Sequence, residues 1–263
     1  MSRPTLSLLP VLLLAGCSWM RAPRIPMPHA AHAAPSEPRG LVVLLPGVGD
    51  RPEAFEQHGF VERIHALDPS LDVVVADAHL GYYLGEIVSE RVHHDVVARR
   101  LEGGTYDRVW LVGISLGGLG AMAYAADYPH RVDGVILLAP YLGPPAVVDE
   151  IRAAGSLAAW RPQQLAHYDG PTHRLSHAAW RWWRDVAARP AEMPRVFLGY
   201  GDDDEFRDAH ELLAKGLPAD RLATVPGGHS WAAWRPLFDT LLPRALGADR
   251  TPELAAEVRL GGE

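Results

Sequence analysis

Cysteine, lysine and long apolar runs are all scarce in this sequence of 263 residues. The single cysteine, Cys17, excludes an internal disulfide and a cysteine-rich zinc site. Lys215 is the only lysine, and the formal net charge is −7 with no basic block. Nucleic acid is therefore not expected as a partner. The hydrophobic share of 48% and the charged share of 22% instead suit a globular protein with a full core.

The first apolar run covers residues 6–14, and it is well short of the roughly 20 residues that a membrane-spanning helix needs. A short run of this kind behind a polar start is typical of a secretory signal peptide. It ends in Leu14-Ala15-Gly16-Cys17, which resembles the lipobox of bacterial lipoproteins. A plain signal peptide with an incidental cysteine is the alternative.

The lipobox resemblance implies that residues 1–16 are removed and that Cys17 carries lipid such as palmitate. The protein would then be anchored to a membrane of the bacterial cell envelope. Ser18, where an aspartate would favour the inner membrane, points to the outer membrane and an orientation towards the periplasm. Residues 17–39 are rich in proline and alanine, and we expect them to form an extended tether.

The folded part begins near Gly40 and shows alternating strand and helix patterns up to residue 246, before a short tail over residues 247–263. Apolar runs without alternation indicate strands that are buried on both faces, as in a parallel sheet. The predicted class is α/β, mostly parallel, with helices on both faces. The expected strands are 41–45, 73–75, 109–112, 132–138, 196–198 and 221–225, and the expected helices are 53–67, 86–100, 117–128, 205–215 and 230–246.

Residues 141–192 are too long for a simple crossover between two strands. They hold Trp160, Trp180, Trp182 and Trp183, and we interpret them as an inserted helical cap. Packing of these tryptophans in a peripheral helix against the sheet is an equally weighted alternative.

The most informative motif is Gly113-Ile114-Ser115-Leu116-Gly117, between a β-branched strand and a helix rich in small residues. Glycines two positions before and two positions after a serine indicate a turn too tight for a side chain at either flank. Such a turn would expose the Ser115 hydroxyl. The N–H of Leu116 would lie at a helix N-terminus, where it suits a developing oxyanion.

This motif, in this context, resembles the nucleophile elbow of the α/β-hydrolase superfamily, and the resemblance extends from about Leu41 to Phe238. In that family the serine comes first along the chain, the acid follows a later strand and the histidine comes last. The resemblance implies an α/β-hydrolase fold and a serine hydrolase.

The acid is expected in Asp202-Asp203-Asp204, directly after the strand that ends at Gly201. The family's usual spacing from the glycine selects Asp204, with Asp202 and Asp203 as competitors. A calcium site is a weaker interpretation of this acidic loop, because the spacing is not that of an EF-hand.

Gly227-Gly228-His229 follows the last expected strand, and it resembles the histidine loop of the family. His229 is therefore the candidate base. His173 and His177 have a spacing that can bind zinc, but no third ligand is evident in the sequence. We interpret that pair as solvated or packed within the cap.

By resemblance, the second oxyanion donor is the backbone N–H of Val48, in the loop that starts at Pro46-Gly47. The implied activity is hydrolysis of small to medium carboxylic esters, without a metal or an organic cofactor. Thioesterase, peptidase and acyltransferase activities use the same residues and remain open, as does a non-catalytic lipoprotein that binds an envelope partner. The sequence does not indicate an oligomeric state.

Overall fold

The computed structural model describes residues 21–102, 106–162 and 171–247. Within these ranges, seven strands form one sheet in the order β1-β3-β2-β4-β5-β6-β7. All neighbouring pairs are parallel except β1 with β3. The strands are β1 (His29–His32), β2 (Gly40–Leu45), β3 (Leu71–Ala76), β4 (Arg108–Ile114), β5 (Gly134–Leu138), β6 (Arg195–Gly201) and β7 (Leu222–Val225).

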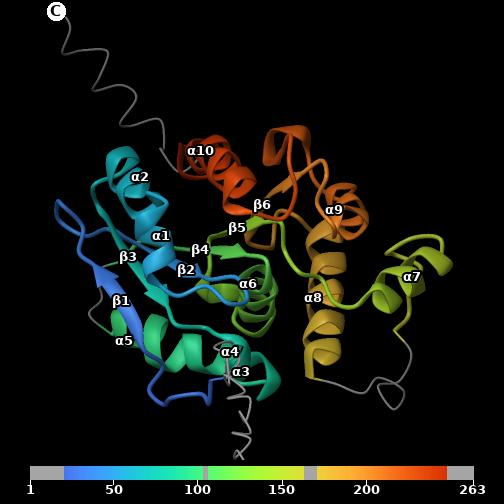
Figure 1. Cartoon of the computed structure of the whole chain (residues 1–263), viewed down its shortest axis with the longest axis horizontal. Coiled ribbons are helices and arrows are strands. Elements are labelled where there is room, and N and C mark those ends of the chain that lie inside the picture. Colours follow the sequence, from blue (N-terminus) through green and yellow to red (C-terminus); the bar gives the residue numbers. More distant parts are fainter. Residues whose placement is uncertain (1–20, 103–105, 163–170, 248–263) are drawn as a thin grey trace, which may run out of the picture.

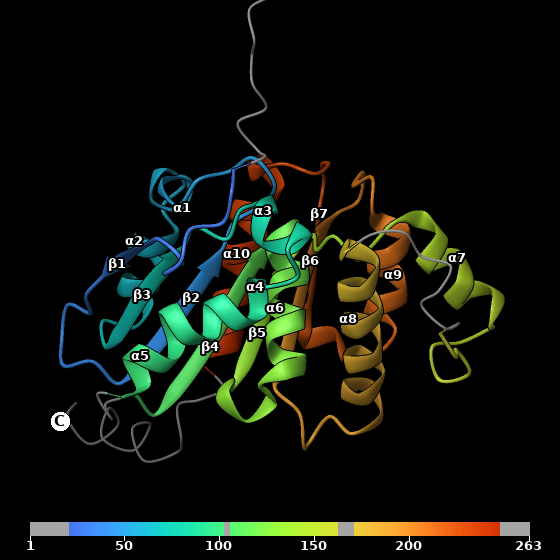
Figure 2. The ribbon, with the colours of Figure 1, turned by 90° about the horizontal axis from the view of Figure 1, so that it is seen from below.

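Helices cover both faces of the sheet, so the mostly parallel α/β class predicted from the sequence is confirmed (Figures 1 and 2). Helices α2 and α10 pack on one face, and α6 with the helical segment 88–101 packs on the other. The α-helices are α1 (Glu53–Gln57), α2 (Phe60–Leu67), α3 (Leu80–Leu84), α4 (Val88–Arg91), α5 (Ala98–Leu101), α6 (Leu116–Asp127), α7 (Pro145–Ala153), α8 (Pro171–Ala188), α9 (Arg207–Ala214) and α10 (Trp231–Gly247). A π-helix spans Val92–Val97, and 3₁₀ turns span Pro129–Arg131 and Ala219–Arg221.

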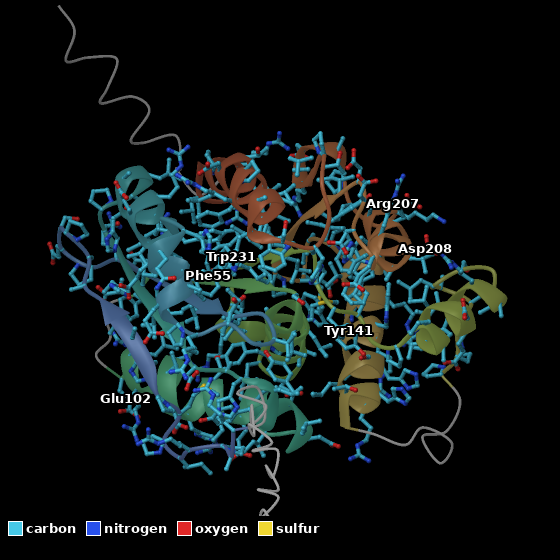
Figure 3. The ribbon with its side chains drawn as sticks, viewed as in Figure 1. Phe55, Glu102, Tyr141, Arg207, Asp208 and Trp231 are labelled. Carbon is cyan, nitrogen blue, oxygen red and sulfur yellow. The ribbon has the colours of Figure 1, made fainter. Side chains whose placement is uncertain are left out.

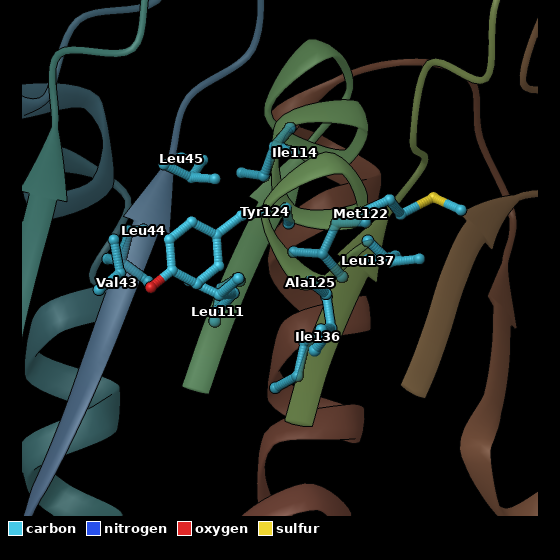
Figure 4. Packing of buried hydrophobic residues seen from close by; sticks show 14 of the residues in the cluster. Val43, Leu44, Leu45, Leu111, Ile114, Met122, Tyr124, Ala125, Ile136 and Leu137 are labelled. Atoms are coloured by element: carbon cyan, nitrogen blue, oxygen red, sulfur yellow. The ribbon is translucent and has the colours of Figure 1, made fainter. Parts of the chain in front are cut away.

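Helix α6 is the central helix of its face, and its residues 116–125 are all buried. Figure 4 shows Tyr124 and Met122 of this helix packed over apolar side chains of β2, β4 and β5. A helix buried on all sides has no polar face, which explains its continuous run of small and apolar residues. The first residue of α6 follows Ser115, so this packing fixes the position of the candidate nucleophile.

Two of the expected helices are interrupted. The helix expected over residues 53–67 breaks at Gly59, whose φ of 75° is left-handed and ends the helical path. The helix expected over residues 86–100 contains the π-helical turn, and Asp95 within that turn is buried. Its carboxylate accepts a hydrogen bond from the N–H of Met27 at 2.8 Å. The wider turn thus serves a contact with a distant segment, which local periodicity does not reveal.

The segment expected to form a cap contains α7 and α8. Helix α8 packs beside α6, and α7 lies further out (Figure 2). The side chains of Trp180, Trp182 and Trp183 on α8 are buried, and the indole of Trp180 donates to the carbonyl oxygen of Leu142 at 2.9 Å. In α8 these tryptophans therefore contribute to the core beside α6, and the interpretation of residues 141–192 as a cap stays a prediction.

Residues 21–34 do not form the free tether that their composition predicts. β1 pairs antiparallel with β3, and Met27 is buried. The guanidinium of Arg21 donates two hydrogen bonds to the carboxylate of Asp77, at 2.8 and 2.7 Å. Prolines favour an extended chain, and here that extended chain pairs with the edge of the sheet.

Several expectations concern residues outside the described ranges: the leader over residues 1–16, Cys17 and almost all of the tail. Within the described part of the chain, no helix is long and apolar enough to cross a bilayer.

Candidate active site

Ser115 occupies a strained turn between β4 and α6, with φ 51° and ψ −116°. A Cβ atom on Gly113 would lie 2.3 Å from the carbonyl oxygen of Gly117. A Cβ atom on Gly117 would lie 2.0 Å from the carbonyl oxygen of Leu45. Both distances are far below van der Waals contact, so the two glycines are sterically required, as the motif predicts. The turn brings Ser115 to the carboxyl end of the sheet, where the residue is buried with 5% of its surface exposed, rather than open to solvent as the motif predicted.

The serine, histidine and aspartate that the sequence predicts for the site lie together. The Ser115 hydroxyl oxygen is 2.8 Å from His229 Nε2, and His229 Nδ1 is 2.8 Å from an Asp204 carboxylate oxygen. With a proton on Nδ1, the imidazole donates to Asp204 and its Nε2 accepts the serine proton. This is the arrangement that activates a serine for attack on a carbonyl.

Asp204 is held as a carboxylate behind the histidine, and its side chain is fully buried. Burial alone would raise the pKa of Asp204, but the hydrogen bonds from the His229 ring and from the N–H of Phe206 outweigh it. The net result is a pKa below the ordinary value of an aspartate.

The other two acids of the loop are exposed and do not bond to His229. Asp202 accepts a hydrogen bond from the N–H of Gly227 at 2.9 Å, so it connects the acid loop to the histidine loop. Gly227 itself has a φ of 123°, in the region that favours glycine. Of the three competing acids, only Asp204 reaches the imidazole.

The loop expected to supply the second oxyanion donor lies directly against the serine. A Cβ atom on Gly47 would lie 3.5 Å from the Cβ of Ser115. Val48 follows Gly47, and Leu116 begins α6 beside Ser115. Leu116 therefore adjoins Ser115 along the chain and the loop of Val48 adjoins it in space, while the role of both residues as oxyanion donors stays a prediction.

A hydrogen bond connects this oxyanion loop to the start of α10. The indole of Trp231 donates to a carboxylate oxygen of Asp50 at 3.4 Å, and burial raises the pKa of Asp50. Trp231 also packs edge-to-face on Phe55, with ring centroids 5.5 Å apart (Figure 3). Neither Asp50 nor Trp231 is indicated by the sequence motifs, although each lies within two residues of a predicted site position.

His210 of α9 is a third residue near the site that the sequence motifs do not indicate. It is fully buried, and its Nε2 donates to the carbonyl oxygen of Pro140 at 3.0 Å. Burial lowers the pKa of His210 to about 4, so the ring is neutral at pH 7. Pro140 contacts α6, because a Cβ atom on Gly118 would lie 2.6 Å from the Cβ of Pro140. His210 thus supports the backbone beside the serine turn.

A small cavity of about 170 Å³ adjoins the histidine through Phe206. The ring of Phe206 meets the ring of His229 edge-to-face at 5.0 Å. The apolar lining of the cavity comes from Leu142, Pro145, Val148, Phe206 and Ala209.

The structure gives no support for metal binding at the two histidines of α8. His177 is buried and lies 3.5 Å from Glu150 and edge-to-face on Trp160. Among the described residues, no group of three or more His, Cys, Asp or Glu side chains is arranged to hold a metal ion. The interpretation of His177 as packed between helices agrees with these contacts.

Known proteins share this fold. The chain is similar to a structure of a ferulic acid esterase, with 17% identity, a TM-score of 0.55 and coverage of 81% of this chain and 86% of that one. It is similar to Est1E from Butyrivibrio proteoclasticus, with 20% identity, a TM-score of 0.52 and coverage of 80% and 88%. For an S-formylglutathione hydrolase from Agrobacterium tumefaciens the identity is 21%, the TM-score 0.54 and the coverage 84% and 89%.

The family comparison extends over more than half of the chain. Residues 92–245 match the Esterase family model, described as "Putative esterase". The matched region begins before the serine turn and ends within α10, so it includes Ser115, Asp204 and His229. With its mostly parallel sheet and serine turn, the chain belongs to the esterase family of α/β-hydrolases.

Proposed function

We propose that the protein is a serine carboxylester hydrolase that acts through an acyl-enzyme. The observation that carries this proposal is the continuous chain of hydrogen bonds from Ser115 through His229 to Asp204. Family membership supports hydrolysis, and this geometry supplies a nucleophile, a base and a group that orients the base.

In the first half of the reaction, His229 accepts the hydroxyl proton while Ser115 attacks the ester carbonyl. Asp204 stabilises the imidazolium that forms. In this proposal the backbone N–H groups of Val48 and Leu116 stabilise the negative oxygen of the tetrahedral intermediate. His229 then gives its proton to the leaving alkoxide, and the acyl group stays on Ser115 as an ester.

In the second half, water takes the place of the alcohol. His229 removes a proton from the water while the water oxygen attacks the acyl-serine carbonyl, and it then gives that proton to the Ser115 oxygen as the carboxylic acid is released. The apolar wall of the cavity beside Phe206 supports a small or medium hydrophobic group in the substrate, while Asp149, Arg152, Glu205 and Asp208 give the rest of its lining a charged character. No step requires a metal or an organic cofactor.

The test uses the chain that begins at Cys17 and a soluble ester, p-nitrophenyl butyrate. We expect hydrolysis by the wild type and loss to background in Ser115→Ala, with a fluorophosphonate probe labelling only the wild type. Ser36→Ala is the matched control, because Ser36 is exposed and distant from the site in sequence. A protein that neither reacts with the probe nor hydrolyses the ester would instead support the non-catalytic alternative.

The same residues would also act on a thioester, and one of the structurally similar proteins is an S-formylglutathione hydrolase. A parallel assay with butyryl thiocholine separates the two substrate classes. A kcat/KM for the oxygen ester above that for the thioester is the result expected for a carboxylester hydrolase.

We also propose that the mature protein is a lipoprotein of the bacterial cell envelope, anchored through Cys17. The proposal rests on the lipobox-like Leu14-Ala15-Gly16-Cys17 at the end of a short apolar run.

A further inference from the structure

The N-terminal arm, residues 21–28, is fixed to the domain by several independent contacts. Arg21 forms its ion pair with Asp77, whose side chain is only 11% exposed. The backbone N–H and carbonyl of Arg24 both bond to the Tyr82 hydroxyl, at 3.0 and 2.7 Å. Met27 is buried at the end of the arm. Arg21, the first residue that the structure describes, is therefore held at a defined place on the surface.

Arg21, through Asp77, lies at the same edge of the sheet as the candidate active site. Asp77 follows the carboxyl end of β3, and Ser115 follows the carboxyl end of β4. The strands are parallel in the order β3-β2-β4, so the two positions are two strand spacings apart, about 10 Å across the sheet. Helix α3, which follows Asp77, contacts α6, since a Cβ atom on Gly120 would lie 2.4 Å from the Tyr83 hydroxyl.

Three exposed apolar side chains belong to segments at this edge of the sheet. Among the described residues, the large hydrophobic side chains that are exposed are Ile25, Val48, Leu67 and Leu84. Ile25 is 66% exposed and belongs to the arm, Val48 is 47% exposed beside the serine, and Leu84 is 45% exposed at the end of α3. Leu67 ends α2, just before β3 begins, and so lies at the opposite edge. Figure 2 shows α3 beyond the arrowhead of β2.

The distance along the chain from Arg21 to Cys17 is four residues, which reach at most about 15 Å when fully extended. A lipid on Cys17 would therefore hold this edge close to the bilayer. A tether of the length predicted from composition would have left the domain free to turn. With residues 21–28 fixed to the domain, the part of the predicted tether that could allow this turning is limited to residues 17–20.

We propose that the edge of the sheet that carries Ser115 lies against the membrane in which Cys17 is anchored, with Ile25 and Leu84 in contact with the lipid. Its substrates are then esters whose acyl chains are inserted in that bilayer, and they reach Ser115 from the membrane surface. The inference rests on the proposed hydrolase activity for the substrate and on lipidation for the anchor. A lipid chain together with an apolar contact gives stable membrane association where a single chain is marginal.

The orientation is tested without any enzymatic readout. Because Cys17 is the only cysteine and lipidation consumes its thiol, a cysteine introduced at Leu84 or Leu67 is the only reactive thiol in the chain. Lipidated Leu84→Cys and Leu67→Cys proteins carry an environment-sensitive nitrobenzoxadiazole dye and are reconstituted in phosphatidylcholine vesicles. We expect at least a threefold rise in dye fluorescence at position 84 over the protein in solution, and no rise at position 67. Equal changes at both positions, or a rise only at position 67, would overturn the orientation.

The substrate class is tested with the lipidated full chain in the same vesicles. An Ile25→Asp, Leu84→Asp double variant is compared with Leu67→Asp and the wild type, with a long-chain umbelliferyl ester in the bilayer and p-nitrophenyl butyrate in solution. The double variant should hydrolyse the bilayer ester at least fivefold more slowly and keep its rate on the soluble ester, while Leu67→Asp keeps both rates. An unchanged rate on the bilayer ester in the double variant contradicts the inference. A wild type inactive on the soluble ester contradicts the proposed function instead.

Discussion

Ser115 and Ala139 both have a positive φ, and hydrogen bonds connect the backbone of Ser115 to Leu138 and Tyr141, on either side of Ala139. Ser115 has a φ of 51° and Ala139 a φ of 45°. The Ser115 N–H donates to the carbonyl oxygen of Leu138 at 3.0 Å, and the Tyr141 N–H donates to the carbonyl oxygen of Ser115 at 2.8 Å. Both backbone polar groups of Ser115, the N–H and the carbonyl oxygen, are therefore hydrogen-bonded to residues beside the bend at Ala139.

Substitution of Ala139 tests whether this bend positions the nucleophile. Ala139→Gly should leave kcat and stability nearly unchanged, because glycine adopts this backbone readily. Ala139→Val should lower the free energy of unfolding by about 2 kcal/mol, since a β-branched residue is strained at positive φ. It should also lower kcat more than it changes KM. Urea unfolding and steady-state kinetics give both quantities, and a valine variant with wild-type kcat would show that the bend has no positioning role.

Substitution of each of the three adjacent aspartates by asparagine is expected to have a different effect on kcat. Asp204→Asn should reduce kcat by about 10³- to 10⁴-fold, because the asparagine no longer holds the imidazole in the productive tautomer. Asp203→Asn should have little effect, since Asp203 is exposed and does not contact His229. Asp202→Asn keeps a side-chain oxygen for the N–H of Gly227 and should fall between the two. The ester assay on the purified variants measures these differences in kcat. A large loss of activity in Asp203→Asn with activity kept in Asp204→Asn would refute the assignment of Asp204 as the acid.

His210 predicts a loss of stability in mild acid. Its pKa is about 4 in the folded protein and about 6.5 when unfolded, so the unfolded chain binds the extra proton first. The contribution of His210 is complete above about pH 6.5, and about 3 kcal/mol is lost as the pH falls to about 4. His210→Gln, which keeps a donor for Pro140 and does not titrate, should show a shallower decline. The measurement is urea unfolding from pH 7 to 4, and identical slopes in the two proteins would contradict the prediction.

The lipid anchor predicts a change of location in Cys17→Ala. In a bacterial host that processes lipoproteins, the wild type should partition with the membrane fraction and into detergent. The variant should appear in the soluble fraction, because the thiol that accepts the lipid is missing. Mass spectrometry of the N-terminal peptide measures the acyl groups directly. Membrane association that persists in Cys17→Ala would count against the anchor.

The sequence was sufficient for the fold class and for the candidate Ser115, because their signals are local, whereas His229 was chosen through the resemblance of its Gly-Gly-His loop to the family's histidine loop. Glycines on both sides of a serine indicate a turn with no room for side chains, and continuous apolar runs indicate strands that are buried on both faces. Asp204 needed the family's usual spacing, since three consecutive carboxylates are locally equivalent. The structure separates them by burial and by the position of His229.

Long-range contacts were the features that local patterns did not predict. Arg21 pairs with Asp77, 56 residues further along the chain, and His210 bonds to Pro140, 70 residues before it. Neither contact leaves a periodic signal, and prolines around an arginine resemble a solvated linker. The ion pair of Arg21 with Asp77 and the burial of Met27 arise only in the folded sheet, where β1 pairs with β3.

The pairing of β1 with β3 has a consequence for any shortened form of the protein. A chain that starts at Gly40 would keep every residue of the proposed catalytic machinery. It would also uncover the free backbone groups of β3, where an unprotected strand invites pairing with another molecule. We expect such a truncation to precipitate or self-associate although its catalytic groups are complete. The proline-rich stretch, which looks dispensable from its composition, would then protect the protein against aggregation.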